Sequence, residues 1–184
     1  GFCAVNHVAV AARHLQAERL AERVLIVDWD VHHGNGTQDI FYADPSVHLL
    51  SLHQMPLFPG TGAPEETGEG PGRGTIWNVP LAAGLSRREH LDLFRDSLAR
   101  LAETVVPDFI LISAGYDALA GDPLASLSLE PEDFAELTRE VSGWADAVCG
   151  GRVVAVLEGG YDPARTGRAV GKTLRALADA RPTD

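Results

Sequence analysis

The sequence predicts an α/β fold in which helices flank a mainly parallel β-sheet. Five short, mostly apolar runs follow one another along the 184 residues, and longer segments with apolar residues at helical spacing separate most of them. Strands that alternate with helices form parallel sheets with helices packed on their faces. A chain of this length can bury a substantial core, so we expect residues 1–184 to belong to one domain.

The predicted strands share short length and a high content of Val, Leu and Ile. They comprise residues 24–27, 47–52, 75–79, 109–112 and 153–157. Such runs are typical of strands that are buried on both faces of a parallel sheet.

The predicted helices comprise residues 5–20, 87–105, 131–148 and 163–180. The last two begin at Pro131 and Pro163, where the missing backbone N–H of proline costs nothing. Residues 55–74 are rich in Pro and Gly and lack apolar periodicity, which predicts a long loop. Long loops in compact domains are often functional.

Composition disfavours several classes of protein. The formal net charge of -11 argues against a nucleic-acid partner and mildly favours a cationic substrate. Without a basic leader or a long apolar segment, we expect no signal peptide, no membrane span and a cytoplasmic location. The two cysteines, Cys3 and Cys149, are too few for a disulfide framework and are expected to be reduced.

Acidic and imidazole side chains follow the first predicted strand. If the chain stays extended, Asp28, Asp30 and His32 point to the same face. Ionised acids are costly to bury unless they are paired or bind a metal. A solvated surface turn is the alternative, and the wholly apolar strand before it disfavours that reading. The pattern therefore predicts a divalent metal site, whereas His33 is expected to be structural.

Further polar residues follow the other predicted strands. Ligands of open parallel sheets lie beyond the carboxyl ends of the strands, where His53, Asp117 and residues 158–161 are also expected. A catalytic zinc needs three protein ligands and an open position, and Asp117 would be the third ligand. A turn-capping role is the alternative for Asp117, and Fe²⁺ or Co²⁺ would also suit two carboxylates and an imidazole.

Residues 28–38 also resemble the active-site signature of zinc-dependent histone deacetylases and of the related bacterial amidohydrolases. Other segments resemble blocks of that family in the same order, namely residues 1–3, 51–53, 58–62, 114–117, 121–123 and 158–161. The resemblance covers nearly the whole chain. It implies a three-layer α/β/α fold of the arginase/deacetylase type and a metal-dependent deacetylase that hydrolyses the acetamide of acetyl-lysine or a similar acetylated amine.

The resemblance implies roles for individual residues. It assigns zinc to Asp30, His32 and Asp117, and stabilisation of the oxyanion to the hydroxyl of Tyr161. Asp28 and Asn35 match positions that orient two catalytic histidines, with the Asn typical of the class II-like branch. The acyl-lysine tunnel would be lined by Gly1, Phe2, Phe58, Leu124 and Gly159. A structural K⁺ or Na⁺ would be held at Asp28, Asp30, His32, Ser51 and Leu52.

The family's catalytic His-His pair lies upstream of the Gly-Phe-Cys block with which this sequence begins. We therefore expect a C-terminal portion of the catalytic domain, with the N-terminal part of the fold absent and little activity alone. Alternatives are a non-catalytic acyl-lysine or metal-binding module and an acetylpolyamine or small-amide amidohydrolase. A two-metal ureohydrolase is disfavoured because Gly34 stands where a bridging carboxylate would be needed. The substrate, the native metal and the oligomeric state are not determined by the sequence.

Overall fold

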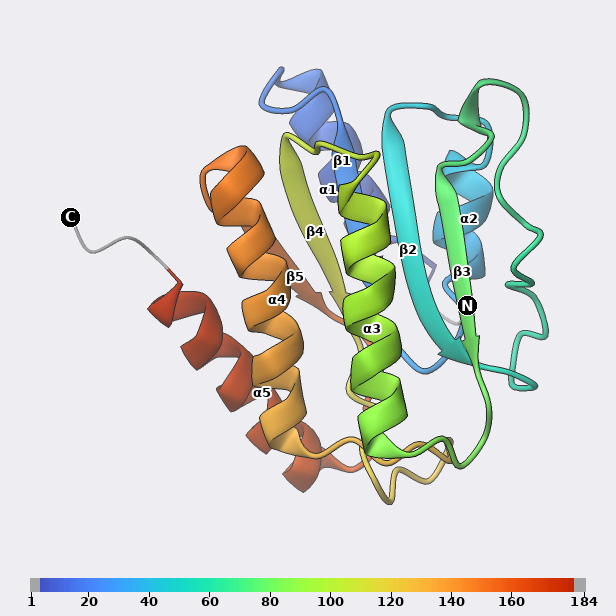
Figure 1. Cartoon of the computed structure of the whole chain (residues 1–184), viewed down its shortest axis with the longest axis vertical. Helices are drawn as coiled ribbons and strands as arrows, with labels where there is room; N and C mark the ends of the chain where they lie inside the picture. The colour runs from blue at the N-terminus through green and yellow to red at the C-terminus, as the bar shows by residue number, and fades with distance from the viewer. Residues whose placement is uncertain (1–3, 181–184) are drawn as a thin grey trace.

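Five parallel strands form one sheet in the computed structural model, which describes residues 4–180 (Figure 1). Their spatial order is β3-β2-β1-β4-β5. The strands are β1 (Val24–Asp28), β2 (Val47–Gln54), β3 (Ile76–Leu81), β4 (Phe109–Ala114) and β5 (Val153–Leu157). The predicted parallel sheet is thus confirmed, and each predicted strand matches an observed one to within two residues at either end.

The pairing register brings the carboxyl ends of the central strands to one level. Asp28 at the end of β1 is paired with Ser51 of β2 on one side and with Ser113 of β4 on the other. Because the carboxyl ends of parallel strands meet at one edge, the loops that follow β1 and β4 start side by side.

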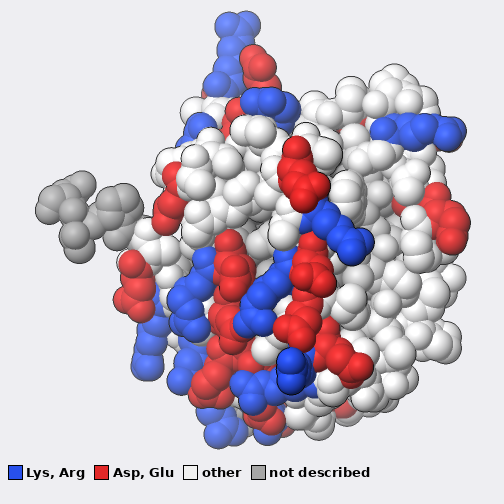
Figure 2. All heavy atoms as spheres, in the orientation of Figure 1, with Lys and Arg blue, Asp and Glu red and all other residues white. Residues whose placement is uncertain are grey.

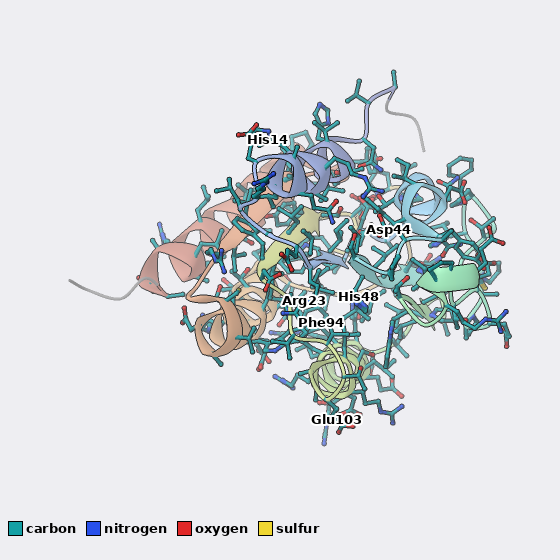
Figure 3. The ribbon with its side chains drawn as sticks, turned by 90° about the horizontal axis from the view of Figure 1, so that it is seen from above. His14, Arg23, Asp44, His48, Phe94 and Glu103 are labelled. Atoms are coloured by element: carbon teal, nitrogen blue, oxygen red, sulfur yellow. The ribbon has the colours of Figure 1, made fainter. Side chains whose placement is uncertain are left out.

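Helices cover both faces of the sheet, which makes the three-layer arrangement visible from above (Figure 3). Helices α1 (His7–Ala17) and α2 (Asn35–Phe41) lie on one face, and α3 (Arg87–Ala102) and α4 (Pro131–Cys149) lie on the other. Helix α5 (Pro163–Asp179) packs on α4. Each face buries its own apolar cluster, so both faces of the sheet are parts of the core.

Local signals explain where the long helices begin and end. Ser86 and Glu89 form a reciprocal capping box at the start of α3. Pro131 and Pro163 occupy the first turns of α4 and α5, as predicted from their position. Helix α4 ends at Gly150, whose φ of 62° places it in the left-handed conformation that glycine adopts without strain.

The structure differs from the sequence analysis in two places. Helix α2 was not predicted, because its sequence Asn-Gly-Thr-Gln-Asp-Ile-Phe has low helix propensity and its buried Thr37, Gln38 and Phe41 are held by tertiary packing. The chain also does not stay extended beyond Asp28. Instead, the Asp28 carboxylate accepts the N–H of Asp30 at 3.0 Å and the Asp30 carboxylate accepts the N–H of His32 at 2.8 Å, which bends the backbone twice.

Charged side chains gather over α3, α4 and α5, while the surface over β2, β3 and the long loop carries few of them (Figure 2). Arg87 of α3 binds both oxygens of Asp133 of α4 at 2.6 Å, and Lys172 of α5 binds Glu132 at 3.0 Å.

Within residues 4–180, no helix is long and apolar enough to cross a membrane. Cys149 is a buried free thiol, and Cys3 lies outside the described residues.

Candidate metal centre

Three potential metal ligands meet at the carboxyl edge of the sheet. Asp30 and His32 lie in the double bend after β1, and Asp117 follows β4. One ligand atom from each residue lies within 4.8 Å of the other two. The Nδ1 atom of His32 is 3.0 Å from Oδ2 of Asp117 and 3.2 Å from Oδ1 of Asp30. The structure therefore brings together the three residues that the sequence predicted as ligands.

Backbone amides hold the two carboxylates in place. Oδ1 of Asp117 accepts the N–H of Val31 at 2.8 Å, and Oδ2 of Asp30 accepts the N–H of Gly159 at 2.8 Å. Because each carboxylate is fixed by a backbone amide, its position does not depend on a flexible partner.

Two glycines allow the backbone to approach this closely. A Cβ atom added to Gly159 would overlap with the carboxylates of Asp30 and Asp117, and one added to Gly115 would overlap with Asp30. Larger residues would displace the carboxylates, so the glycines belong to the site although they carry no ligand atom.

The three side chains shift one another's pKa values. Hydrogen bonds to Asp117 and Asp30 raise the pKa of His32 to about 10. Burial raises the pKa of Asp117 to about 6 against the opposing hydrogen bond from His32. Burial also acts to raise the pKa of Asp30, but the hydrogen bonds from His32 and Gly159 outweigh it, so this pKa is lowered.

The donor set fits a divalent metal ion. Two carboxylates and one imidazole share a small, largely buried space, and the Asp117 side chain is fully buried. Two buried carboxylates favour a positive charge between them, which the proton of His32 supplies here and which a divalent ion bound in its place would also supply. Two oxygens and one nitrogen leave further coordination positions open, which matches a catalytic zinc site and is also compatible with Fe²⁺ or Co²⁺.

Asp28, the last residue of β1, lies next to this cluster and binds the N–H of Asp30. Its side chain is buried beneath Gly34, where an added Cβ would overlap with the carboxylate. Burial, and then the negative charge of Asp30, raise the pKa of Asp28 well above its usual value. Ser51 is buried beside Asp28 in the sheet register, and Leu52 follows it in β2. The residues predicted to share a monovalent cation are thus neighbours, while the cation itself stays a prediction.

Asn35 opens helix α2 next to the ligand segment. Its Oδ1 atom is buried and has no hydrogen-bond partner among the residues that the structure describes. Buried polar atoms in proteins nearly always have a partner, so this oxygen is available to water or to a group outside the described residues.

The residues predicted to contact substrate lie at the surface. Tyr161 is 47% exposed, and its ring stands edge-on to His32 at 6.3 Å between ring centroids. Phe58 and Leu124 are 51% and 49% exposed. Gly1 and Phe2 lie outside the described residues, so the complete tunnel stays a prediction.

Sequence reasoning missed the network that anchors the long loop. The Glu66 carboxylate accepts hydrogen bonds from Nε2 of Gln38 at 2.5 Å and from the N–H of Gly62 at 3.2 Å. His33 bonds to Gln38 at 3.0 Å and to Thr61 at 2.8 Å, which agrees with its expected structural role. Gln38 belongs to the signature quoted above, but Glu66 gave no signal because a Glu in a polar loop is usually solvated.

Comparisons with known proteins agree with this geometry. The family model described as the histone deacetylase domain matches residues 1–177. "Histone deacetylase 10, chloroplastic" of Oryza sativa subsp. japonica is 45% identical over 96% of this chain and 40% of its own length. A "probable deacetylase" of Archaeoglobus fulgidus is 45% identical over 88% of this chain and 45% of its own length.

A solved structure, the crystal structure of the HDA15 HD domain, superimposes with a TM-score of 0.90 and 39% sequence identity. The match covers 100% of this chain and 52% of that one. This chain therefore spans about half of the solved structure, and 40% and 45% of the two curated relatives. On the family match and the shared fold, the chain belongs to the histone deacetylase family.

Proposed function

We propose that this chain supplies the metal centre and the oxyanion donor of a deacetylase that hydrolyses the acetamide of acetyl-lysine or a similar acetylated amine. The observation that carries the proposal is the convergence of Asp30, His32 and Asp117, with their ligand atoms within 4.8 Å of one another. Membership of the deacetylase family supports the same reaction class.

We propose that Asp30, His32 and Asp117 hold a zinc ion through Nδ1 of the histidine and one oxygen of each carboxylate. Zinc, when bound, supplies Lewis-acid chemistry toward the acetamide carbonyl and the attacking water. The two carboxylates balance the charge of the ion, and the amides of Val31 and Gly159 keep them oriented.

Tyr161 is the proposed oxyanion donor. Its hydroxyl would donate a hydrogen bond to the carbonyl oxygen as negative charge develops there. The proposal is supported by its ring beside His32 and by the fixed position of Gly159, which precedes it by two residues. Phe58, Leu124 and Gly159, with Gly1 and Phe2, are proposed to surround the aliphatic stem of the substrate.

Proton transfer requires a further group. Each ring nitrogen of the buried His33 and His53 already has a hydrogen-bond partner inside the protein. We propose that a group from outside residues 4–180 performs acid–base catalysis and is oriented by Asp28 and Asn35. The unpartnered Oδ1 atom of Asn35 supports this assignment.

Zinc titration of the purified chain tests the metal centre. We expect one zinc ion to bind, and Asp117→Asn or His32→Ala to weaken binding by more than the roughly 10–100-fold typical of lost second-sphere partners. Isothermal titration calorimetry with a competing chelator measures the affinity. Asp39→Asn, which changes an exposed acid of α2, is the matched control and should bind zinc normally. Unchanged zinc affinity in both ligand variants would refute the proposed centre.

A further inference from the structure

Backbone hydrogen bonds attach the segment that carries Tyr161 to other parts of the protein. The N–H of Gly159 binds Asp30 at 2.8 Å, and the carbonyl of Gly159 accepts the N–H of Tyr116 at 2.8 Å. The N–H of Tyr161 binds Oδ2 of Asp122 at 2.8 Å. The first two contacts hold the glycine, and the third holds Tyr161 itself.

Gly160 turns the backbone sharply between these points. Its φ is 137°, a conformation that side chains of L residues rarely adopt. A Cβ atom here would lie 2.7 Å from Oγ1 of Thr166 and 3.2 Å from Cβ of Tyr116. Gly160 places no side chain against the turn, so the bond from Tyr161 to Asp122 contributes to the direction in which the chain leaves it.

Asp122 is well suited to make that contact rigid. It is 5% exposed, and both of its carboxylate oxygens are used. Oδ2 accepts the N–H of Tyr161, while Oδ1 accepts the N–H of Leu124 at 2.9 Å. Hydrogen bonds to an ionised acceptor are stronger than neutral ones, and a buried carboxylate depends on them.

The loop around Asp122 is itself anchored to the core. Leu119 and Leu129 form an isolated parallel bridge, and the N–H of Asp122 binds the carbonyl of Leu119 at 3.1 Å. The N–H of Ser126 binds the side chain of Gln54 at the end of β2 at 2.8 Å. The carboxylate of Asp122 is therefore a fixed point relative to the sheet.

We propose that Asp122 is a positioning residue that sets the place of the Tyr161 hydroxyl relative to the metal ligands. This inference rests on the proposed role of Tyr161 as oxyanion donor. Asp122 does not touch the substrate in this scheme and acts through the backbone of Tyr161. Because it also binds the N–H of Leu124, it joins the Tyr161 segment to the loop between β4 and α4.

A double-mutant cycle tests the proposal without requiring turnover. The chain is loaded with Co²⁺, whose visible spectrum reports the ligand geometry, and is titrated with acetohydroxamate, a small acetyl-bearing metal chelator. We expect Tyr161→Phe to weaken chelator binding about 10- to 100-fold, as for the loss of one hydrogen bond to a charged acceptor. Asp122→Asn should weaken it similarly, and the double variant should bind no more weakly than Tyr161→Phe alone.

Asp108→Asn is the matched control. Asp108 likewise accepts backbone N–H groups, those of Glu22 and Arg23, but it precedes β4 at the opposite edge of the sheet. This variant should leave the chelator affinity unchanged. An unchanged Co²⁺ spectrum in every variant, together with native circular dichroism, shows that the ligands and the fold are intact.

The outcomes separate this proposal from the proposed function. If the unmodified chain gives no Co²⁺ spectrum, or if Tyr161→Phe does not change chelator binding, the proposed function fails at the metal or at the oxyanion donor. If Tyr161→Phe weakens binding but Asp122→Asn has no effect, or if the two effects simply multiply, only the positioning role of Asp122 is overturned.

Discussion

At the scale of single residues, the candidate site depends on how closely backbone and carboxylates approach. Gly115 and Gly159 leave room for Asp30 and Asp117, and the amide of Gly159 orients one of them. The same turn continues to Tyr161, so the proposed metal ligands and the proposed oxyanion donor are parts of one connected structure. This connection places the proposed oxyanion donor, in the turn after β5, beside the proposed ligands in the loops after β1 and β4.

Substitution of Tyr161 distinguishes an enzyme from a binding module. In the full-length protein, Tyr161→Phe should lower kcat for an acetyl-lysine peptide by roughly 10²–10³-fold, as for the loss of one oxyanion donor. Zinc affinity should not change, because the hydroxyl is not a proposed ligand. A fluorogenic acetyl-lysine assay and a zinc titration measure the two quantities. A Tyr161→Phe variant that keeps full turnover would contradict the enzymatic role of Tyr161. If the unmodified full-length protein binds acyl-lysine without any turnover, the non-catalytic binding module is favoured.

At the scale of secondary-structure elements, ion pairs join the helices of the charged face. Asp133 at the start of α4 is 1% exposed in its side chain and binds Arg87 of α3 through both oxygens. The second helix pair, α4 and α5, is joined by Lys172 and Glu132. Because Asp133 is buried, loss of its ion pair with Arg87 should lower the free energy of unfolding more than loss of an exposed ion pair on the same helices.

Arg87→Ala should therefore lower the free energy of unfolding by about 2–3 kcal/mol, because it leaves a buried carboxylate without its charged partner. The adjacent Arg88 provides a matched control. Its side chain is 91% exposed and pairs with Asp92 within the same helix, so Arg88→Ala should cost less than about 0.5 kcal/mol. Urea denaturation followed by circular dichroism measures both values, and equal losses would contradict the distinction.

Helix α3 also makes stability depend on pH. His90 is 2% exposed, and burial lowers its pKa to about 4. The unfolded chain binds a proton at this residue near pH 6.5, whereas the folded protein does not until about pH 4. The contribution of neutral His90 to the free energy of unfolding is thus fully present above about pH 6.5. As the pH falls toward 4, the free energy of unfolding decreases by an amount on the order of 3 kcal/mol.

Unfolding of the His90→Phe variant isolates this contribution. Other buried histidines add to the pH dependence of the unmodified protein, including His53, whose pKa burial lowers to about 4. The free energy of unfolding of the variant should fall less between pH 7 and pH 4.5 than that of the unmodified protein. An identical pH dependence in the two proteins would show that His90 does not titrate as expected.

At the scale of the whole molecule, the strand order decides where the site lies. β1 is the central strand, with β2 and β4 on its two sides, so the loops after β1 and β4 converge on the same space. The side chains labelled Arg23 and His48 in Figure 3 belong to the opposite, amino edge of the sheet, which carries none of the proposed ligands. On the face shown in Figure 2, charged side chains concentrate over α3, α4 and α5.

The 184-residue chain is expected to bind zinc while hydrolysing acetyl-lysine slowly. Positioned acid–base catalysis contributes about 10²–10⁴-fold, and the described residues at the metal centre include no proposed group for that role. The chain also spans 40% and 45% of the two curated relatives. A continuous assay with acetyl-lysine peptide measures turnover, with Asp117→Asn as the metal-free background. Hydrolysis at ordinary enzyme rates, about 1–10³ s⁻¹, would contradict this expectation.

Local sequence patterns determined much of the fold and the composition of the candidate site. The apolar runs predicted all five strands because strands of a parallel sheet are buried on both faces. The position of Asp30 and Asp117 after two such runs predicted their proximity, because the carboxyl ends of neighbouring parallel strands meet. Pro131 and Pro163 located the starts of two helices through a restriction that acts within one residue.

Tertiary structure decided what depends on residues distant in the chain. Helix α2 forms because burial of Phe41 in the tertiary structure compensates for the low helix propensity of its sequence. The links from Glu66 to Gln38 and from Asp122 to Tyr161 join segments 28 and 39 residues apart. Sequence alone determined the strands and the candidate ligands because their signals are local, whereas these contacts exist only after packing excludes water and requires a partner for every buried polar group.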